Sequence, residues 1–231
     1  MEDYVAVEKR LKIFLNGVNI INLSCTPFMI EELINGLFLT EEIVKDKILP
    51  ENMNITYGDE IIVDVISRNA DISETSALGC LGGVTFTKRK SFERVIDHFS
   101  TSGDDIRMLF AKFQEKSDLF RLTGCFHSAA LSDGQKILVY ADDIGRHNTI
   151  DKLVGYCVLK DIPLVNKMIL LSCRISSDIV SKCAKWKIPL IASRAAPTDL
   201  AIDIATRTGI TLIGFLRGDR FNIYTNRHRV S

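Results

Sequence analysis

The fold is decided by residues 168–215, which read MILLSCRISSDIVSKCAKWKIPLIASRAAPTDLAIDIATRTGITLIGF. Short apolar runs, which predict strands, alternate here with longer segments that predict helices: the runs are 168–172, 189–193 and 210–215, and the segments are 177–185 and 198–208. Gly209 is placed to end the second helix. Strands that alternate with helices predict a parallel sheet, because a helical crossover returns the chain to the same edge of the sheet.

The same alternation continues on both sides of this stretch. Residues 136–140 predict a strand, 147–159 a helix, and 221–224 a further strand. A helix is also predicted from Asp104, with Ser102 or Asp104 as its cap and with one apolar face formed by Ile106, Leu109, Phe110 and Phe113. We therefore predict an α/β domain over residues 76–231, with a mixed, mostly parallel sheet and flanking helices.

The first 75 residues have a different pattern. Asn16-Gly17 stands between two apolar runs and predicts a β-hairpin, because both residues adopt the positive φ of a type I′ turn. Residues 29–35 predict a short helix that ends at Gly36, and residues 60–66 predict a strand. Residues 1–75 are thus expected to form a smaller, β-rich part.

Composition excludes several classes of protein. Apolar residues make up 46% of the 231 residues, and 29 basic residues balance 29 acidic ones, so neither a nucleic-acid nor a membrane surface is expected. The first residues are unlike a signal peptide, and we expect a cytoplasmic protein with reduced thiols. No two of the six cysteines form a C-x-x-C pair, and the zinc deaminase signature is absent, so no metal site is predicted.

The segment after the 136–140 strand, ADDIGRHNTIDK at 141–152, gathers acids, Arg146 and His147 at the start of a helix. One interpretation is a phosphate or cofactor site, because helix N-termini attract anions. The other is a solvated helix entry that Asn148 or Thr149 caps.

The C-terminal segment GFLRGDRF, at 214–221, also has two interpretations. Arg217 and Arg220 can grip a phosphate, while Asp219 can accept hydrogen bonds from the pairing edge of guanine. Alternatively, Gly218 and Asp219 form the tip of a turn.

His127 lies among small residues in TGCFHSAAL, at 123–131, which suits close packing around a ligand; a buried histidine with its hydrogen bonds satisfied is the alternative.

Cys80 is the cysteine that we predict to be reactive. It lies among Gly79, Gly82 and Gly83 in a segment, 76–90, that we expect to be a mobile loop, whereas the other five cysteines lie in apolar or helical contexts. The alternative is a small apolar anchor for a tight turn.

Together these segments resemble the FdhD family of formate dehydrogenase accessory sulfurtransferases. The resemblance is carried by four motifs in order: Thr26-Pro27 with Glu31-Glu32-Leu33 and Gly36-x-Phe38-Leu39-Thr40-Glu41; Thr123-Gly124-x-x-His127-x-Ala129-Ala130-Leu131; Asp143-Ile144-Gly145-Arg146-His147-Asn148-x-x-Asp151-Lys152; and Phe215-Leu216-Arg217-Gly218-Asp219-Arg220-Phe221-x-x-Tyr224.

This resemblance implies that the protein accepts persulfide sulfur from a cysteine desulfurase. The sulfur would pass to the molybdenum of the bis(molybdopterin guanine dinucleotide) cofactor before formate dehydrogenase receives it. A fold similar to cytidine deaminases and a homodimer are also implied. The implied cofactor contacts are Phe215, Leu216, Arg217, Gly218, Asp219 and Arg220, with Arg146, His147 and His127 near the cofactor.

The sequence departs from the family at one position. Many members have C-x-x-C in the loop, whereas here Cys80 matches the first cysteine and Gly83 occupies the position of the second. Two functions therefore compete: a persulfide carrier that works with Cys80 alone, and a non-catalytic chaperone that binds and delivers the cofactor. A nucleoside deaminase, suggested by the fold alone, lacks its zinc ligands.

Overall fold

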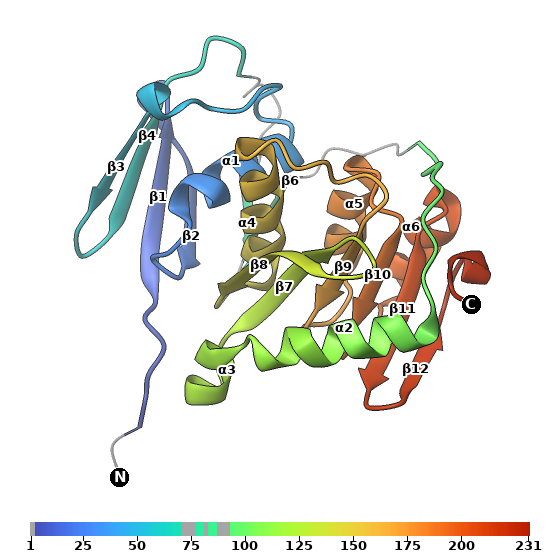
Figure 1. Ribbon diagram of the computed structural model, residues 1–231. Helices are drawn as coiled ribbons and strands as arrows, with labels where there is room; N and C mark the ends of the chain where they lie inside the picture. The colour runs from blue at the N-terminus through green and yellow to red at the C-terminus, as the bar shows by residue number, and fades with distance from the viewer. Residues whose placement is uncertain (1–2, 71–76, 81–82, 87–92) are drawn as a thin grey trace.

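The computed structural model describes residues 3–70, 77–80, 83–86 and 93–231; for 77–80 and 83–86 it describes the backbone alone. The larger sheet has the strand order β12-β11-β10-β9-β7-β8 (Figure 1). Its strands are β7 (His127–Ser132), β8 (Ile137–Asp143), β9 (Met168–Leu171), β10 (Leu190–Ser193), β11 (Thr211–Arg217) and β12 (Arg220–Ile223).

The strand directions confirm a mixed sheet in which most strands run one way, although only two of its five strand pairings are parallel. β10 pairs in parallel with β9 and with β11, whereas β7 pairs antiparallel with both β8 and β9, and β12 antiparallel with β11. Consequently β8, β9, β10 and β11 all run one way, and only β7 and β12 run the other way. The insertion of β7 between β8 and β9 was not predicted, because small residues at 128–130 gave no strand signal.

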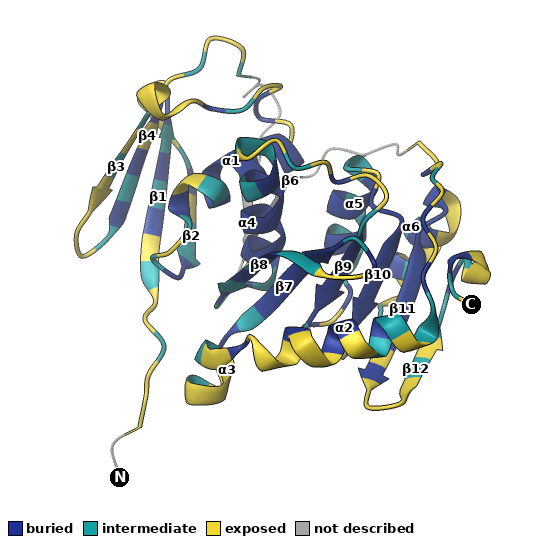
Figure 2. Ribbon diagram, viewed as in Figure 1, coloured by how far each residue is buried: buried dark blue, intermediate teal, exposed yellow. Residues whose placement is uncertain are grey.

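Helices cover both faces of this sheet. α4 (Arg146–Leu159), α5 (Ser177–Lys185) and α6 (Asp199–Thr208) follow β8, β9 and β10 and pack on one face through a common hydrophobic core. α2 (Gly103–Glu115), capped by Ser102 as predicted, packs on the opposite face, and α3 (Asp118–Thr123) follows it (Figure 1). Figure 2 shows the sheet in dark blue beside the largely yellow α2, whereas α4 is mostly dark blue because α1 packs on it.

The N-terminal part contains a second sheet, of order β2-β1-β4-β3, and a helix. Its elements are β1 (Lys9–Leu15), β2 (Val18–Cys25), α1 (Ile30–Thr40), the 3-10 turn η1 (Pro50–Asn52), β3 (Met53–Tyr57) and β4 (Ile61–Val65). The hairpin at Asn16-Gly17 is confirmed, with φ of 50° and 82° at these two residues. β1 also pairs in parallel with β4.

The prediction that Gly36 ends a helix is wrong, because α1 continues to Thr40. Gly36 instead lies where α1 crosses α4. A Cβ at Gly36 would lie 1.8 Å from the carbonyl oxygen of Asp151, and a Cβ at Gly155 would lie 1.8 Å from the carbonyl oxygen of Glu32. These two glycines therefore let the backbones of α1 and α4 touch, which fixes the N-terminal part on the larger sheet.

The prediction that the whole segment 76–90 is a loop is wrong, because part of it forms two strands. β5 (Ala77–Cys80) and β6 (Gly83–Phe86) form an antiparallel hairpin in which Cys80 pairs with Gly83, and this hairpin lies against β2 and α4. Glycine disfavours strands, which explains the prediction, but a two-residue connection favours a hairpin. The predicted mobility concerns the rest of 76–90, which lies outside the described residues. The side chain of Cys80 is also outside what the structure describes.

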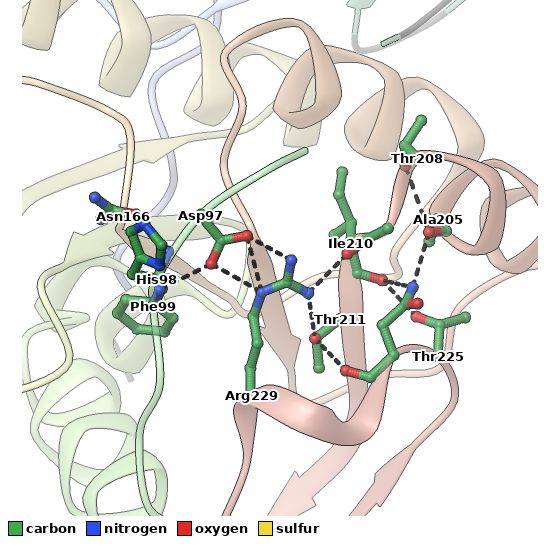
Figure 3. Close-up of polar contacts among 12 residues, drawn as sticks. Asp97, His98, Phe99, Asn166, Ala205, Thr208, Ile210, Thr211, Thr225 and Arg229 are labelled. Atoms are coloured by element: carbon green, nitrogen blue, oxygen red, sulfur yellow. Dashed lines mark hydrogen bonds and ion pairs between the residues drawn. The ribbon is translucent and has the colours of Figure 1, made fainter. Parts of the chain in front are cut away.

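The C-terminus closes the larger domain through Arg229, which lies in the 3-10 turn η2 (Arg227–Arg229). Figure 3 shows its guanidinium between Asp97, whose carboxylate it holds through Nε at 3.0 Å and Nη2 at 2.5 Å, and the side chain of Thr211. The Arg229 Nη1 group also donates to the carbonyl of Gly209 at 2.7 Å. This contact anchors the segment that joins the cysteine hairpin to α2.

Candidate functional site

The carboxyl ends of β8, β9, β10 and β11 lie along one edge of the larger sheet, because these strands run in the same direction. The helices α4, α5 and α6 begin at that edge, and the antiparallel strand β7 starts there with His127. The positive ends of three helix dipoles therefore face the same space, which favours a negatively charged ligand.

The loops that follow β9 and β10 are joined to each other and to β11. The Ile175 amide donates to Ala196 O at 3.1 Å, and the Phe215 amide donates to Ala195 O at 3.2 Å. Phe215 has a φ of 52°, which is unfavourable for a residue with a side chain and costs about 1–3 kcal/mol. Its ring is 43% exposed at this edge. A strained, exposed aromatic residue held by neighbouring loops is a candidate ligand contact.

Four arginines extend from these loops: Arg146 after β8, Arg174 after β9, Arg194 after β10 and Arg217 at the end of β11. We call them the arginine edge. Within the described part of the chain, none of the four guanidinium groups pairs with a carboxylate; Arg217 Nε donates to the carbonyl of Arg194 at 3.3 Å and lies over the Phe215 ring, 5.9 Å from its centroid. Unpaired arginines beside helix N-termini suit a phosphate-bearing ligand.

The turn that carries Arg146 and His147 is held by the buried carboxylate of Asp143. Its Oδ1 accepts from the Gly145 amide at 2.7 Å and from Asn148 Nδ2 at 2.8 Å, and its Oδ2 forms an ion pair with Lys152 at 2.6 Å. The expected capping by Asn148 or Thr149 is therefore wrong: α4 begins at Arg146, its N-cap residue is Gly145, and no side chain caps it. Because Asn148 and Lys152 are buried, this segment is not a solvated helix entry.

Buried polar atoms without hydrogen-bond partners gather at the starts of α4 and α5. Among the described residues, six buried side-chain nitrogen or oxygen atoms have no hydrogen-bond partner, and four of them are Arg146 Nε, both ring nitrogens of His147, and Ser176 Oγ. Such groups are costly unless something completes their hydrogen bonds. This set fits a ligand that brings several acceptor oxygens, as a diphosphate does.

His147 is uncharged in this arrangement. Burial, and then the nearby charges of Lys182 and Arg146, lower its pKa to about 3. Its Nε2 lies 3.7 Å from Asp178 Oδ2, which is too long for a hydrogen bond. A neutral imidazole donates through one nitrogen and accepts through the other, so His147 can orient a ligand but adds no charge at neutral pH.

A pocket of about 350 Å³ continues the arginine edge under α2 and α3. It includes His127, Ser172 and Arg194, and its aromatic wall is formed by Phe110, Phe113, Phe120 and Phe126. Burial, and then the charge of Arg146, lower the pKa of His127. The imidazole of His127 is half-buried and makes no hydrogen bond with any described residue, so the alternative of a satisfied buried histidine is wrong. Aromatic walls with a few polar groups suit a flat heterocycle.

Cys125 lines the same pocket and is exposed. The expectation that every cysteine except Cys80 lies in an apolar or helical context is thus wrong for Cys125, because it follows the end of α3 in a surface loop. The other described cysteines, Cys25, Cys157, Cys173 and Cys183, are buried, and no described cysteine forms a disulfide.

The C-terminal motif is a turn and also part of the edge. Gly218 and Asp219 form the tip between β11 and β12, with Arg217 paired to Arg220 across it, so the turn interpretation is confirmed. Leu216 is only 1% exposed and belongs to the hydrophobic core. Its side chain therefore supports the strand, and the groups in this motif that can reach a ligand are Phe215 and the polar residues.

Sequence reasoning missed Arg174 and Arg194. Both stand within three residues of the end of a predicted strand, at 168–172 and 189–193, and that position was the available signal. Two negative findings apply to the described ranges, 3–70, 77–80, 83–86 and 93–231. They contain no group of three or more His, Cys, Asp or Glu side chains placed to hold a metal. They also contain no helix with the length and apolar character needed to span a membrane.

These observations define an α/β protein with a cationic edge and an adjoining aromatic pocket. The profile of the FdhD/NarQ family matches residues 6–231, so the chain belongs to that family. It is similar to proteins named sulfur carrier protein FdhD: 35% identical to that of Bacillus pumilus strain SAFR-032, over 99% of this chain and 91% of the relative, and 33% identical to that of Bacillus subtilis strain 168, over 100% and 91%.

A solved structure agrees with this assignment. The crystal structure of a candidate formate dehydrogenase accessory protein from Desulfotalea psychrophila superimposes with a TM-score of 0.82. The two sequences are 27% identical, and the match covers 100% of this chain and 92% of the other.

Proposed function

We propose that this protein is a sulfurtransferase that serves formate dehydrogenase maturation by carrying persulfide sulfur on Cys80 to a molybdenum bis(molybdopterin guanine dinucleotide) cofactor. The cofactor is the substrate here, not a resident group. The relatives named as sulfur carriers support a sulfur-carrying role, and the accessory protein of known structure supports the link to formate dehydrogenase. A cytoplasmic location and a homodimer remain part of the proposal.

One observation carries the cofactor-binding half: the unpaired arginine edge surrounds buried donors that lack partners. Diphosphate oxygens would complete the hydrogen bonds of Arg146 Nε, His147 and Ser176 Oγ. Arg174, Arg194 and Arg217 would balance the remaining charge. The aromatic pocket beside His127 would accept one ring system of the ligand.

The sulfur-carrying half rests on Cys80. Its thiolate would attack the outer sulfur of the persulfide on a cysteine desulfurase, the donor's S–S bond would break, and the donor's thiolate would leave. The new persulfide would then pass its outer sulfur to the metal of the cofactor: the S–S bond would break, the reduced metal would supply the two electrons that convert this sulfur to sulfide, and Cys80 would leave as the thiolate. Cys80 ends β5, which packs on β2, and its partner strand β6 packs on α4, the helix that begins at the arginine edge.

The pairing of Cys80 with Gly83 favours a second candidate, a chaperone that binds and delivers the cofactor without carrying sulfur. In the hairpin, a cysteine at position 83 would stand directly opposite Cys80, so glycine there removes the thiol closest in register. The two functions differ in what they require of Cys80.

Complementation separates them. In a host that lacks its own accessory protein, the wild-type chain should restore formate dehydrogenase activity. The sulfurtransferase predicts that Cys80→Ala and Arg174→Ala both abolish the rescue. The chaperone predicts that Arg174→Ala abolishes it and that Cys80→Ala does not.

A further inference from the structure

A groove with a basic rim lies at the end of the molecule opposite the arginine edge. It encloses about 390 Å³ and is lined by Val44, Lys45, Asp46, Lys47, Ile48, Asn52, Ile66, Ser67, Arg68 and Asn69. We call it the basic groove. Three cations and one carboxylate line it, in a chain whose formal net charge is zero.

The charges of the basic groove are available to a partner. Lys45 and Arg68 are exposed, and neither makes an ion pair with another described residue. Lys47 holds Asp161 at 3.0 Å, so only two of the three cations are free. Ile66 lines the same groove and is 66% exposed, although it directly follows the buried end of β4. A groove that combines an exposed isoleucine with two unpaired cations fits a protein segment that combines acidic residues with an apolar anchor.

The position of the groove follows from the pairing of the strands. Thr26, just after β2, donates to Asp143 at the end of β8, so β2 ends at the arginine edge. β1 is antiparallel to β2 and β4 is parallel to β1, so β4 ends at the far side of the molecule. The Lys47–Asp161 contact agrees, since Asp161 follows the C-terminus of α4 whereas Arg146 starts that helix. The 14 residues of α4 separate the two sites by about 20 Å.

We infer that the basic groove docks an acidic segment of the protein that donates the persulfide. This inference rests on the proposed function. The protein that receives the cofactor must approach it at the arginine edge, whereas the basic groove remains free when that edge is occupied. Arg68 stands nine positions before Ala77, the first residue of β5, so a donor held in the groove is linked by a short stretch of sequence to the strand that ends at Cys80.

Sulfur loading tests this inference. The wild-type protein is incubated with a cysteine desulfurase and cysteine, and the rate of persulfide formation is followed by intact mass at several donor concentrations. The variant Lys45→Glu/Arg68→Glu should raise the donor concentration for half-maximal loading by about tenfold or more, with the maximal rate unchanged. The matched control Lys112→Glu/Lys136→Glu makes the same change in net charge at two exposed lysines, one in α2 and one in the turn before β8. Its donor concentration for half-maximal loading should stay within about twofold of the wild-type value.

Salt and a milder variant complete the test. Raising the salt should weaken loading of the wild type and leave the charge-reversed variant nearly unchanged. Lys45→Gln/Arg68→Gln, which is less disruptive, should give an intermediate effect with an unchanged melting temperature. The inference is overturned if the reversed variant loads like the control. It is also overturned if loading is normal but formate dehydrogenase activation falls, because the groove would then serve the recipient. A wild-type chain that an active donor cannot load would instead refute the proposed function.

Discussion

Replacing Lys152 by methionine should destabilise the protein severely, because it leaves the Asp143 carboxylate buried without its cation. Both side chains are 0% exposed, and their Nζ and Oδ2 atoms lie 2.6 Å apart. Lys152 Nζ also donates to Thr26 Oγ1 at 2.7 Å. Methionine keeps most of the length and apolar volume of lysine, so the loss is mainly electrostatic.

The expected cost follows from burial. Removing one partner of a fully buried ion pair typically costs about 3–5 kcal/mol, against a total stability of about 5–15 kcal/mol for a folded domain. For a chain of this length, that corresponds to a decrease of roughly 6–20 °C in melting temperature. Urea unfolding followed by circular dichroism at pH 7 measures the free energy, and a thermal scan measures the temperature.

A double variant identifies the cause. Lys152→Met/Asp143→Asn has no buried charge at this place and should be more stable than Lys152→Met alone, although it lacks two interactions instead of one. The reasoning fails if Lys152→Met costs less than about 1 kcal/mol, or if the losses of the two single variants simply add.

Three further outcomes are expected. Gly155→Ala should lower the free energy of unfolding by about 3 kcal/mol or more, because its Cβ would meet the Glu32 carbonyl oxygen at 1.8 Å. A melting temperature within about 2 °C of wild type would contradict the helix contact. Arg174→Ala should weaken the binding of guanosine diphosphate about tenfold, as measured by calorimetry. The control Arg207→Ala, which removes a surface ion pair on α6, should leave binding unchanged. Equal effects of the two variants would contradict phosphate binding at the arginine edge. Burial alone would raise the pKa of Asp97, but hydrogen bonds from Arg229 and the Phe99 amide outweigh it and hold that pKa below its usual 3.8. The Asp97–Arg229 pair therefore stabilises the fold above about pH 4 and loses this effect as the pH falls further. Arg229→Met should reduce stability at pH 6 and flatten the acid dependence of stability below pH 4; an unchanged urea unfolding profile at both pH values would refute this.

Most of the architecture could be predicted because local patterns agree with the tertiary structure. The helices at 177–185 and 199–208 and the three strands around them follow from periodicity and from their caps, such as Thr198 and Gly209. The predictions failed where tertiary contacts override local signals. Gly36 resembles a helix end in the sequence, yet it is required inside α1 by the close approach of α4.

The site was only partly predictable for the same reason. Arg146, His147 and Arg217 stand in conspicuous polar segments, whereas Arg174 and Arg194 become significant only when parallel strands bring their loops to one edge. Asp143 and Lys152 were part of a motif, but their burial as an ion pair depends on Thr26, more than a hundred residues away. The exposure of Cys125 likewise depends on where α3 ends.

The central claim is that Cys80 carries sulfur, and intact-protein mass spectrometry tests it most directly. The purified chain is incubated with cysteine and a cysteine desulfurase that has been shown to load another acceptor. We expect a gain of about 32 Da, the mass of one sulfur atom, that a reductant removes and that is absent in Cys80→Ala but present in Cys125→Ala. No gain in the wild type, or an equal gain in Cys80→Ala, would contradict it.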